Sequence, residues 1–178
     1  NQLGYYYGPS AFNGGNGEYS LLSTGIISDV NWKTTDTRRT YVQVFSGKSY
    51  LTKYSVPSTF IDPAPVMRYA EVLLMAAEAY NRLPSPVTAK AQQYLNMVRE
   101  RAFGDQLHNI TLSGPALTEA IWEERRLELA MEGDRFFDLV RTGKAASTIT
   151  GFVVGKNELF PLPQQEIDIS GLEQNPGY

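Results

Sequence analysis

Residues 66–103 read VMRYAEVLLMAAEAYNRLPSPVTAKAQQYLNMVRERAF, and this stretch decides the fold. From Val66 to Leu83 nearly all residues are helix formers, and the polar side chains fall on one narrow stripe, so we expect a helix buried on most sides. After a short loop, Thr88 is a suitable N-cap, and apolar residues then recur at helical spacing until Gly104 ends the second helix. Because a short loop makes two helices antiparallel, this stretch predicts a helical hairpin.

A second helical pair is predicted after the hairpin. An apolar stripe at helical spacing continues to about Glu132, where Gly133 breaks the helix. Asp134 can then cap a short helix that Gly143 closes. The tail, residues 172–178, is polar and turn-like.

The first sixty residues differ in composition from the rest of the chain. They hold more than half of the aromatic residues, and β-compatible runs such as Thr40–Phe45 lie between turn-forming residues such as Ser46-Gly47-Lys48. We therefore expect a loop-rich segment with short strands at residues 1–60, the candidate ligand-binding lobe. The helical region would cover residues 61–178, and the two together would form one mostly α domain.

Composition excludes several classes of function. The net charge of −3 and the pI near 5.2 do not favour nucleic acid as a partner. The chain has no cysteine, so no disulfide or cysteine-based zinc site can form, and we expect no cofactor. No apolar run is long enough to span a membrane. The chain begins at Asn1 without a charged-then-apolar leader, which indicates a piece of a longer or processed polypeptide.

The charged cluster between Glu123 and Arg141 is the densest feature that could carry chemistry. Paired carboxylates could act in glycoside hydrolysis, so a carboxylate glycosidase is one alternative. However, arginines three or four residues away would lower the carboxyl pKa values, which opposes a general-acid role and favours ion pairs between packed helices. The expected pairs are Arg125 with Glu128, Arg135 with Glu132, and Arg135 and Arg141 with Asp138.

The only histidine, His108, lies in a predicted loop beside Asn109. No carboxylate stands in an evident orienting position, so we expect a packing or surface role rather than a catalytic one.

The aromatic first third has the residue types that a glycan site uses. Sugars present apolar C–H faces and many hydroxyls, and therefore bind aromatic planes flanked by amides and carboxylates. Trp32 is the first choice, since indole offers the largest flat face, although it could instead be a core residue. The candidate glycan-binding residues are Trp32, Tyr5, Tyr7, Asn13, Asn31 and Asp29.

The helical half also resembles a known family. Five motifs in the same order, and the closing Gln174–Tyr178, resemble the C-terminal part of the SusD/RagB family over roughly residues 36–178. The motifs are RYAEVLLMAAEAY at 68–80, YLNMVRERA at 94–102, AIWEERRLELA at 120–130, EGDRFFDLVRTG at 132–143 and LFPLPQQEI at 159–167.

The resemblance implies a non-catalytic glycan-binding lipoprotein at the outer surface of a Bacteroidetes-type bacterium. Its partners would be a glycan and a SusC-like TonB-dependent outer-membrane transporter. It would be attached to the membrane only through an N-terminal lipid anchor, which is absent from this chain. The fold would combine tetratricopeptide-like hairpins with a loop-rich lobe, and the charged motif around Glu124 would be architectural.

Family proteins are longer, so we also expect an apolar patch where earlier hairpins would pack. The family's binding loops vary, so no binding residue is carried over. A helical-repeat interaction scaffold without glycan binding is the main alternative.

Overall fold

The computed structural model describes residues 26–53 and 66–178 and divides the chain into two compact units, Asn1–Glu132 and Gly133–Tyr178. The described residues are mostly helical, which confirms the predicted fold class. The predicted boundary near residue 60 lies outside the described residues and stays a prediction.

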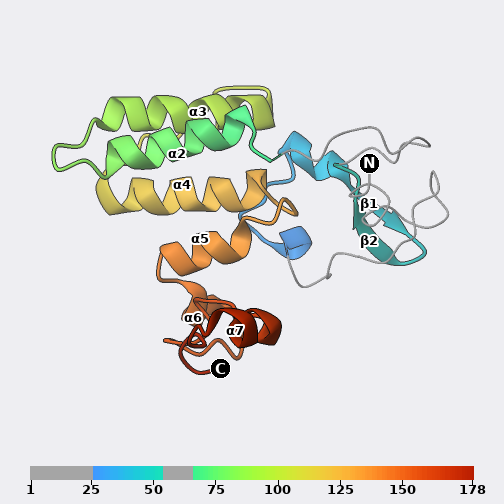
Figure 1. Ribbon diagram of the computed structural model, residues 1–178. Coiled ribbons are helices and arrows are strands. Elements are labelled where there is room, and N and C mark those ends of the chain that lie inside the picture. The colour runs from blue at the N-terminus through green and yellow to red at the C-terminus, as the bar shows by residue number, and fades with distance from the viewer. Residues whose placement is uncertain (1–25, 54–65) are drawn as a thin grey trace. The chain divides into compact units, whose positions relative to one another are not determined.

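Helices α2 (Tyr69–Asn81) and α3 (Thr88–Phe103) form the predicted hairpin (Figure 1). α2 begins three residues later than Val66 because the backbone of Arg68 is extended, at φ −120° and ψ 153°. Thr88 is the first residue of α3 and not its N-cap, so that detail of the prediction was wrong. Gly104 closes α3 in the left-handed conformation, at φ 77°, as predicted.

Helix α4 (Gly114–Glu128) packs against α2 and completes the core of the first unit (Figure 1). Alanines on the facing sides of α2 and α3 let the helices approach closely, and larger apolar side chains fill the space between them. The buried core consists of Ala70, Leu73, Leu74, Ala77, Ala91, Leu95, Val98, Leu117 and Ile121. α4 ends at Glu128, four residues before the predicted end.

Residues 26–53 contain two 3-10 helices and a hairpin. The 3-10 helices are η1 (Ile26–Ser28) and η2 (Thr37–Tyr41), and the strands are β1 (Val42–Phe45) and β2 (Lys48–Leu51). β1 and β2 are antiparallel, with Phe45 opposite Lys48. The two connecting residues, Ser46 and Gly47, both have positive φ values of 50° and 74°, which the right-handed twist of a two-residue hairpin requires. The short strand and its turn were predicted.

The second unit holds three short helices, α5 (Arg135–Arg141), α6 (Ala145–Thr148) and α7 (Gln164–Ser170). Asp134 occupies the N-cap position of α5 as predicted, but its side chain makes no capping hydrogen bond. α6 and α7 were not predicted, because each is about two turns or shorter and gives little periodic signal.

None of the helices in the described part of the chain is both long and apolar enough to cross a membrane. Within the same ranges, no group of three or more acidic, histidine or cysteine side chains is placed to hold a metal ion.

Candidate functional site

The end of α4 carries a network of charges that is centred on buried carboxylates and draws on four other segments. It begins at Arg38 in η2, whose Nε and Nη2 donate to the carboxylate of Asp36 at 2.9 and 2.6 Å. Asp36 is the N-cap of η2 and also accepts from the Arg38 backbone N–H at 2.9 Å. Arg38 Nη1 donates to Glu128 Oε2 at 3.0 Å and lies 2.8 Å from Glu124 Oε1 as an ion pair. One short 3-10 helix is thereby fixed to α4.

Glu128 is the centre of the network. Its Oε1 accepts from Arg68 Nη1 at 2.9 Å and from Arg101 Nη2 at 2.5 Å, while Oε2 accepts from Arg38. Burial raises the pKa of Glu128, but the hydrogen bonds and charges of Arg101, Arg68 and Arg38 outweigh it and hold the pKa at about 2. The carboxylate is therefore ionised at neutral pH and fully occupied by cations.

Glu132 is bound from two sides. It forms an ion pair with Lys53, which follows β2, and accepts from Arg68 Nε at 2.7 Å and Nη2 at 2.6 Å. Burial lowers the pKa of Lys53, although the hydrogen bond to Glu132 opposes this. Lys53 Nζ also donates to the backbone carbonyl of Glu128 at 2.7 Å, so Lys53 and Arg68 together fix the turn that follows α4.

The structure adds partners to this network that the sequence did not predict. Glu128 and Glu132 bind cations from η2, from α3 and from the segments flanking α2 and β2, whereas the sequence pointed to arginines nearby in the chain. Arg125 lies 3.8 Å from Glu71 of α2. The predicted pair of Arg141 with Asp138 is confirmed at 2.7 Å. Helical spacing identifies only neighbours on one helix, so it could not find partners supplied by tertiary contacts.

A cavity of about 230 Å³ opens beside this network in the first unit. Four of its lining side chains are cations and one is a carboxylate, and Trp32 and Tyr41 add aromatic surface. The lining residues are Trp32, Thr37, Arg38, Tyr41, Lys53, Arg68, Arg101, Ala102, Leu127, Glu128 and Ala130.

The chemistry of the network suits architecture better than catalysis. A general acid must hold a proton near neutral pH, and the pKa of Glu128 at about 2 opposes this. The polar contacts of Glu128 fix α2, α3, α4 and η2 to one another. This geometry gives no support to a carboxylate glycosidase at this site.

Trp32, the first choice for stacking on a sugar, is 3% exposed. The Arg39 guanidinium lies 5.2 Å from the ring centroid, and Arg39 Nη1 donates to the Trp32 carbonyl at 2.8 Å. The indole N–H is buried and makes no hydrogen bond to the described residues. Although Trp32 lines the cavity, so little of it is exposed that a sugar could not stack on a full face of the ring, which favours the core alternative for Trp32.

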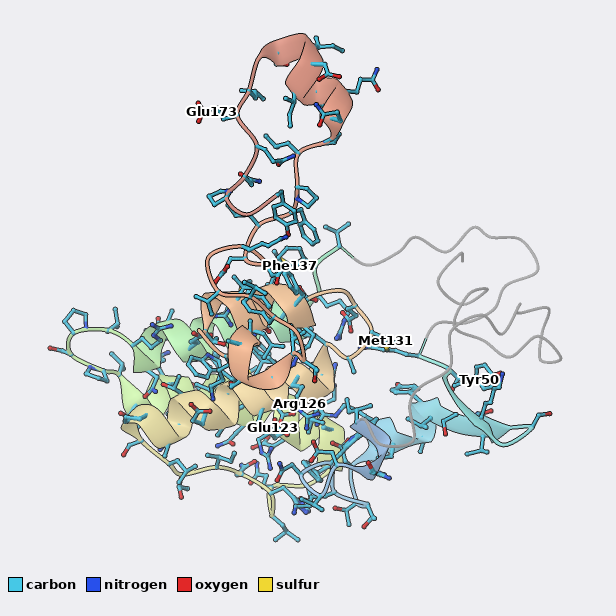
Figure 2. All side chains as sticks on the ribbon, turned by 90° about the horizontal axis from the view of Figure 1, so that it is seen from below. Tyr50, Glu123, Arg126, Met131, Phe137 and Glu173 are labelled. Atoms are coloured by element: carbon cyan, nitrogen blue, oxygen red, sulfur yellow. The ribbon has the colours of Figure 1, made fainter. Side chains whose placement is uncertain are left out.

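The other predicted site residues are placed as follows. Asp29 accepts from the Asn31 backbone N–H at 2.8 Å and pairs with Arg126 at 2.6 Å, so its carboxylate is already engaged. Asn31 is exposed. Arg126 also binds Glu123 on the same helix, and both side chains are labelled in Figure 2. Tyr5, Tyr7 and Asn13 lie outside the described residues. The structure thus brings Asp29, Asn31 and Trp32 into one turn, with only Asn31 exposed.

His108 has an orienting carboxylate, contrary to our expectation. Its Nδ1 lies 3.0 Å from Asp105 Oδ1, its Nε2 lies 3.3 Å from Thr35 Oγ1, and its ring stacks on Phe103 with centroids 3.9 Å apart. The hydrogen bond from His108 is the main reason that the pKa of Asp105 is lowered. The spacing of three between Asp105 and His108 was the sequence signal that could have revealed this pair. The contacts tie the loop after α3 to the segment before η2.

Comparison with known proteins identifies the family. Residues 10–178 match the model of the SusD family, which is nearly the whole chain. The chain belongs to the SusD family.

Individual SusD-family relatives match over more limited lengths. The SusD-like protein P2 of Formosa agariphila is 36% identical over 129 residues, which is 63% of this chain and 25% of that protein. The surface glycan-binding protein A of Bacteroides uniformis has a TM-score of 0.63 and 27% identity, over 82% of this chain and 38% of its own. A putative sugar-binding protein of Bacteroides vulgatus has a TM-score of 0.61 and 26% identity, over 83% of this chain and 37% of its own. This SusD-family chain therefore spans well under half the length of these relatives.

Proposed function

We propose that the protein binds an oligosaccharide or polysaccharide at the outer surface of the outer membrane and delivers it to a SusC-like TonB-dependent transporter without cleaving it. The observation that carries the proposal is the structural likeness to the Bacteroides uniformis protein named for surface glycan binding, over 82% of this chain. The protein of Bacteroides vulgatus named for sugar binding supports the same ligand class.

The charged network supports the non-catalytic part of the proposal. Glu128 is ionised and bound by three arginines, and Glu132 is bound by Arg68 and Lys53. Neither carboxylate is placed as a proton donor, which glycoside hydrolysis requires.

The glycan contacts are proposed to lie in the loop-rich segment, residues 1–60. Among the three candidates that the structure describes, Asn31 is the exposed one, and Asp29 holds the turn that presents it. Trp32 contributes by fixing this turn against the protein interior, while Tyr5, Tyr7 and Asn13 remain the candidate stacking and amide groups.

An array of bacterial, plant, algal and host glycans probed with the 178-residue chain tests the proposal. We expect retention of at least one glycan class, confirmed by calorimetric titration, with no release of reducing ends on prolonged incubation. Retention of no glycan would overturn the binding proposal, and release of reducing ends would overturn the non-catalytic one. Co-purification with a SusC-like transporter tests the delivery step separately.

A helical interaction scaffold without glycan binding is the second candidate, and one observation favours it. The outer face of α2 exposes the apolar side chains of Tyr69, Val72 and Met75, and Leu83 continues the stripe. An exposed apolar stripe of this kind is typical of surfaces that bind other proteins. A chain that retains no glycan but forms a stable complex through this face would favour the scaffold.

A further inference from the structure

The second unit contains a cavity of about 270 Å³ that is lined by four aromatic residues and by no acidic or basic side chain. Ligand sites combine an apolar concave surface with a few hydrogen-bonding groups, and this cavity lies near the lower end of their size range. The polar groups here come from Thr150, Asn157 and the Tyr178 hydroxyl. The lining residues are Phe136, Ile149, Thr150, Gly151, Phe152, Asn157, Leu159, Phe160 and Tyr178.

Phe160 lines this cavity although its side chain is 64% exposed. Hydrogen bonds hold its backbone at its own carbonyl and at Leu162, two residues further on. Asn175 Nδ2 donates to the Phe160 carbonyl at 2.6 Å, and the Gln174 amide binds both the N–H and the carbonyl of Leu162 at 2.7 and 3.0 Å. Pro161 and Pro163 restrict the chain further. A large apolar ring held at the surface by a rigid backbone is a pre-organised contact surface.

Two further phenylalanines extend this aromatic surface. The ring centroids of Phe136 and Phe160 are 5.5 Å apart, and Phe137 lies 5.5 Å from Phe136 and 6.5 Å from Phe160. Phe137, labelled in Figure 2, projects from α5 and is 61% exposed. The rings are tilted against one another, so together they form a broad surface rather than a flat stack.

The groups around Tyr178 favour an uncharged ligand. The Tyr178 hydroxyl donates to the Leu159 carbonyl at 3.0 Å, and Lys156 Nζ lies 4.6 Å from the Tyr178 ring centroid. The ammonium of Lys156 is therefore engaged with the aromatic ring, and neither Lys156 nor any other charged residue is part of the lining. No side chain of the lining would neutralise a carboxylate or sulfate group.

We propose that this cavity is a sugar subsite that binds the apolar face of one uncharged pyranose ring, with Phe160 as the stacking residue. The proposal rests on the glycan binding proposed above and adds a second contact region outside residues 1–60. Aromatic rings suit the C–H face of a pyranose, and the exposed Thr150 hydroxyl suits one of its hydroxyl groups. The Asn157 amide is held in place by the Val153 N–H and the Tyr178 hydroxyl, so it shapes the cavity wall.

Saturation-transfer nuclear magnetic resonance on the full chain tests the subsite. The probes are the methyl glycosides of glucose, galactose, mannose and xylose, with methyl glucuronide as the charged comparison. We expect at least one uncharged glycoside to bind and methyl glucuronide to bind at least tenfold more weakly. Phe160→Ala should weaken binding at least tenfold, Phe160→Tyr should restore it, and Thr150→Val should weaken it several-fold.

Ile169→Ala is the control, because Ile169 is an apolar residue of the same unit that is at least as exposed as Phe160 and does not line the cavity. Circular dichroism and melting temperatures establish that each variant is folded. If folded Phe160→Ala binds the methyl glycosides as well as the wild type does, the subsite proposal is wrong. The proposed glycan binding still stands in that case, provided that the wild-type chain binds array glycans. Equal losses of affinity in Phe160→Ala and Ile169→Ala also contradict the subsite, as does failure of every uncharged methyl glycoside to bind. If the wild-type chain binds no methyl glycoside and also retains no array glycan, both the subsite and the proposed function are wrong.

Discussion

Arg38 and Glu128 are 90 residues apart in the chain, yet their side chains meet at 3.0 Å in a buried ion pair. The pair joins η2 to the C-terminal end of α4, and Asp36 and Glu124 also contact Arg38. The segment before the hairpin strands is therefore fixed to the helices by charge. Because buried charges without partners are costly, the network specifies one arrangement of these segments.

Substitution of Glu128 by glutamine tests the importance of this network. We expect Glu128→Gln to lower the free energy of unfolding by about 3 to 5 kcal/mol, since it leaves Arg38 buried with less compensating charge. Urea denaturation followed by circular dichroism measures the change. Glu173→Gln, at an exposed position near the C-terminus, should change stability by less than about 0.5 kcal/mol. Equal, small effects at both positions would contradict the central role of Glu128.

Glu128 also predicts how stability depends on pH. Its pKa is about 2 in the folded protein, compared with an ordinary value of 4.5. Because the folded pKa is the lower one, the contribution is fully present above pH 4.5 and is lost as the pH falls towards 2. The difference corresponds to on the order of 3 kcal/mol. Urea denaturation at a series of pH values should show a steeper loss for the wild type than for Glu128→Gln, and parallel curves would contradict the assignment.

The contact between Asp105 and His108 makes a local prediction. The hydrogen bond from His108 is the leading cause of the lowered pKa of Asp105. In His108→Ala the pKa of Asp105 should therefore rise towards its ordinary value of 3.8. Titration of the Asp105 carboxyl by carbon-detected nuclear magnetic resonance measures this. Thr35→Val, which removes the hydroxyl on the other ring nitrogen, is the control and should change the pKa of Asp105 less.

The exposed face of α2 predicts detectable apolar surface. Tyr69, Val72 and Met75 are all exposed and recur at a spacing of three. We expect the chain to bind a fluorescent apolar dye and to self-associate at high concentration, and Val72→Lys with Met75→Lys to reduce both. Light scattering and dye titration measure the two effects. Lys90→Gln, at an exposed position of α3, is the control. A monodisperse wild type that binds no dye would contradict this prediction.

The helices and the residues that end them could largely be predicted from the sequence. Apolar spacing placed α2, α3 and α4, and Gly104 closed α3 as expected, because helical periodicity and glycine stops are local signals. The start of α2 was misplaced because Arg68 adopts an extended backbone while its side chain reaches Glu128 and Glu132. That geometry depends on partners about sixty residues away, so no local pattern records it.

The candidate site was less predictable for the same reason. Residue type suggested that Trp32 could stack on a sugar, but exposure depends on what packs around it, and the structure buries the ring. Asp29 has the right chemistry for a sugar hydroxyl, yet Arg126, 97 residues away, engages it. The aromatic cavity in the second unit was missed because its lining residues, between 136 and 178, converge only in three dimensions.

Trp32 offers a direct test between packing and glycan binding. Its ring is 3% exposed and lies beside the Arg39 guanidinium, so Trp32→Ala should lower the free energy of unfolding by about 3 to 5 kcal/mol. Trp32→Phe keeps most of the apolar volume and should cost clearly less. Thermal melts measure the loss of stability, and calorimetric titration with an array-identified glycan measures affinity in the folded fraction. We expect a large fall in stability with affinity nearly unchanged, because a buried ring fixes the turn of Asn31 without touching the ligand. A loss of affinity of tenfold or more at unchanged melting temperature would instead return Trp32 to the glycan site.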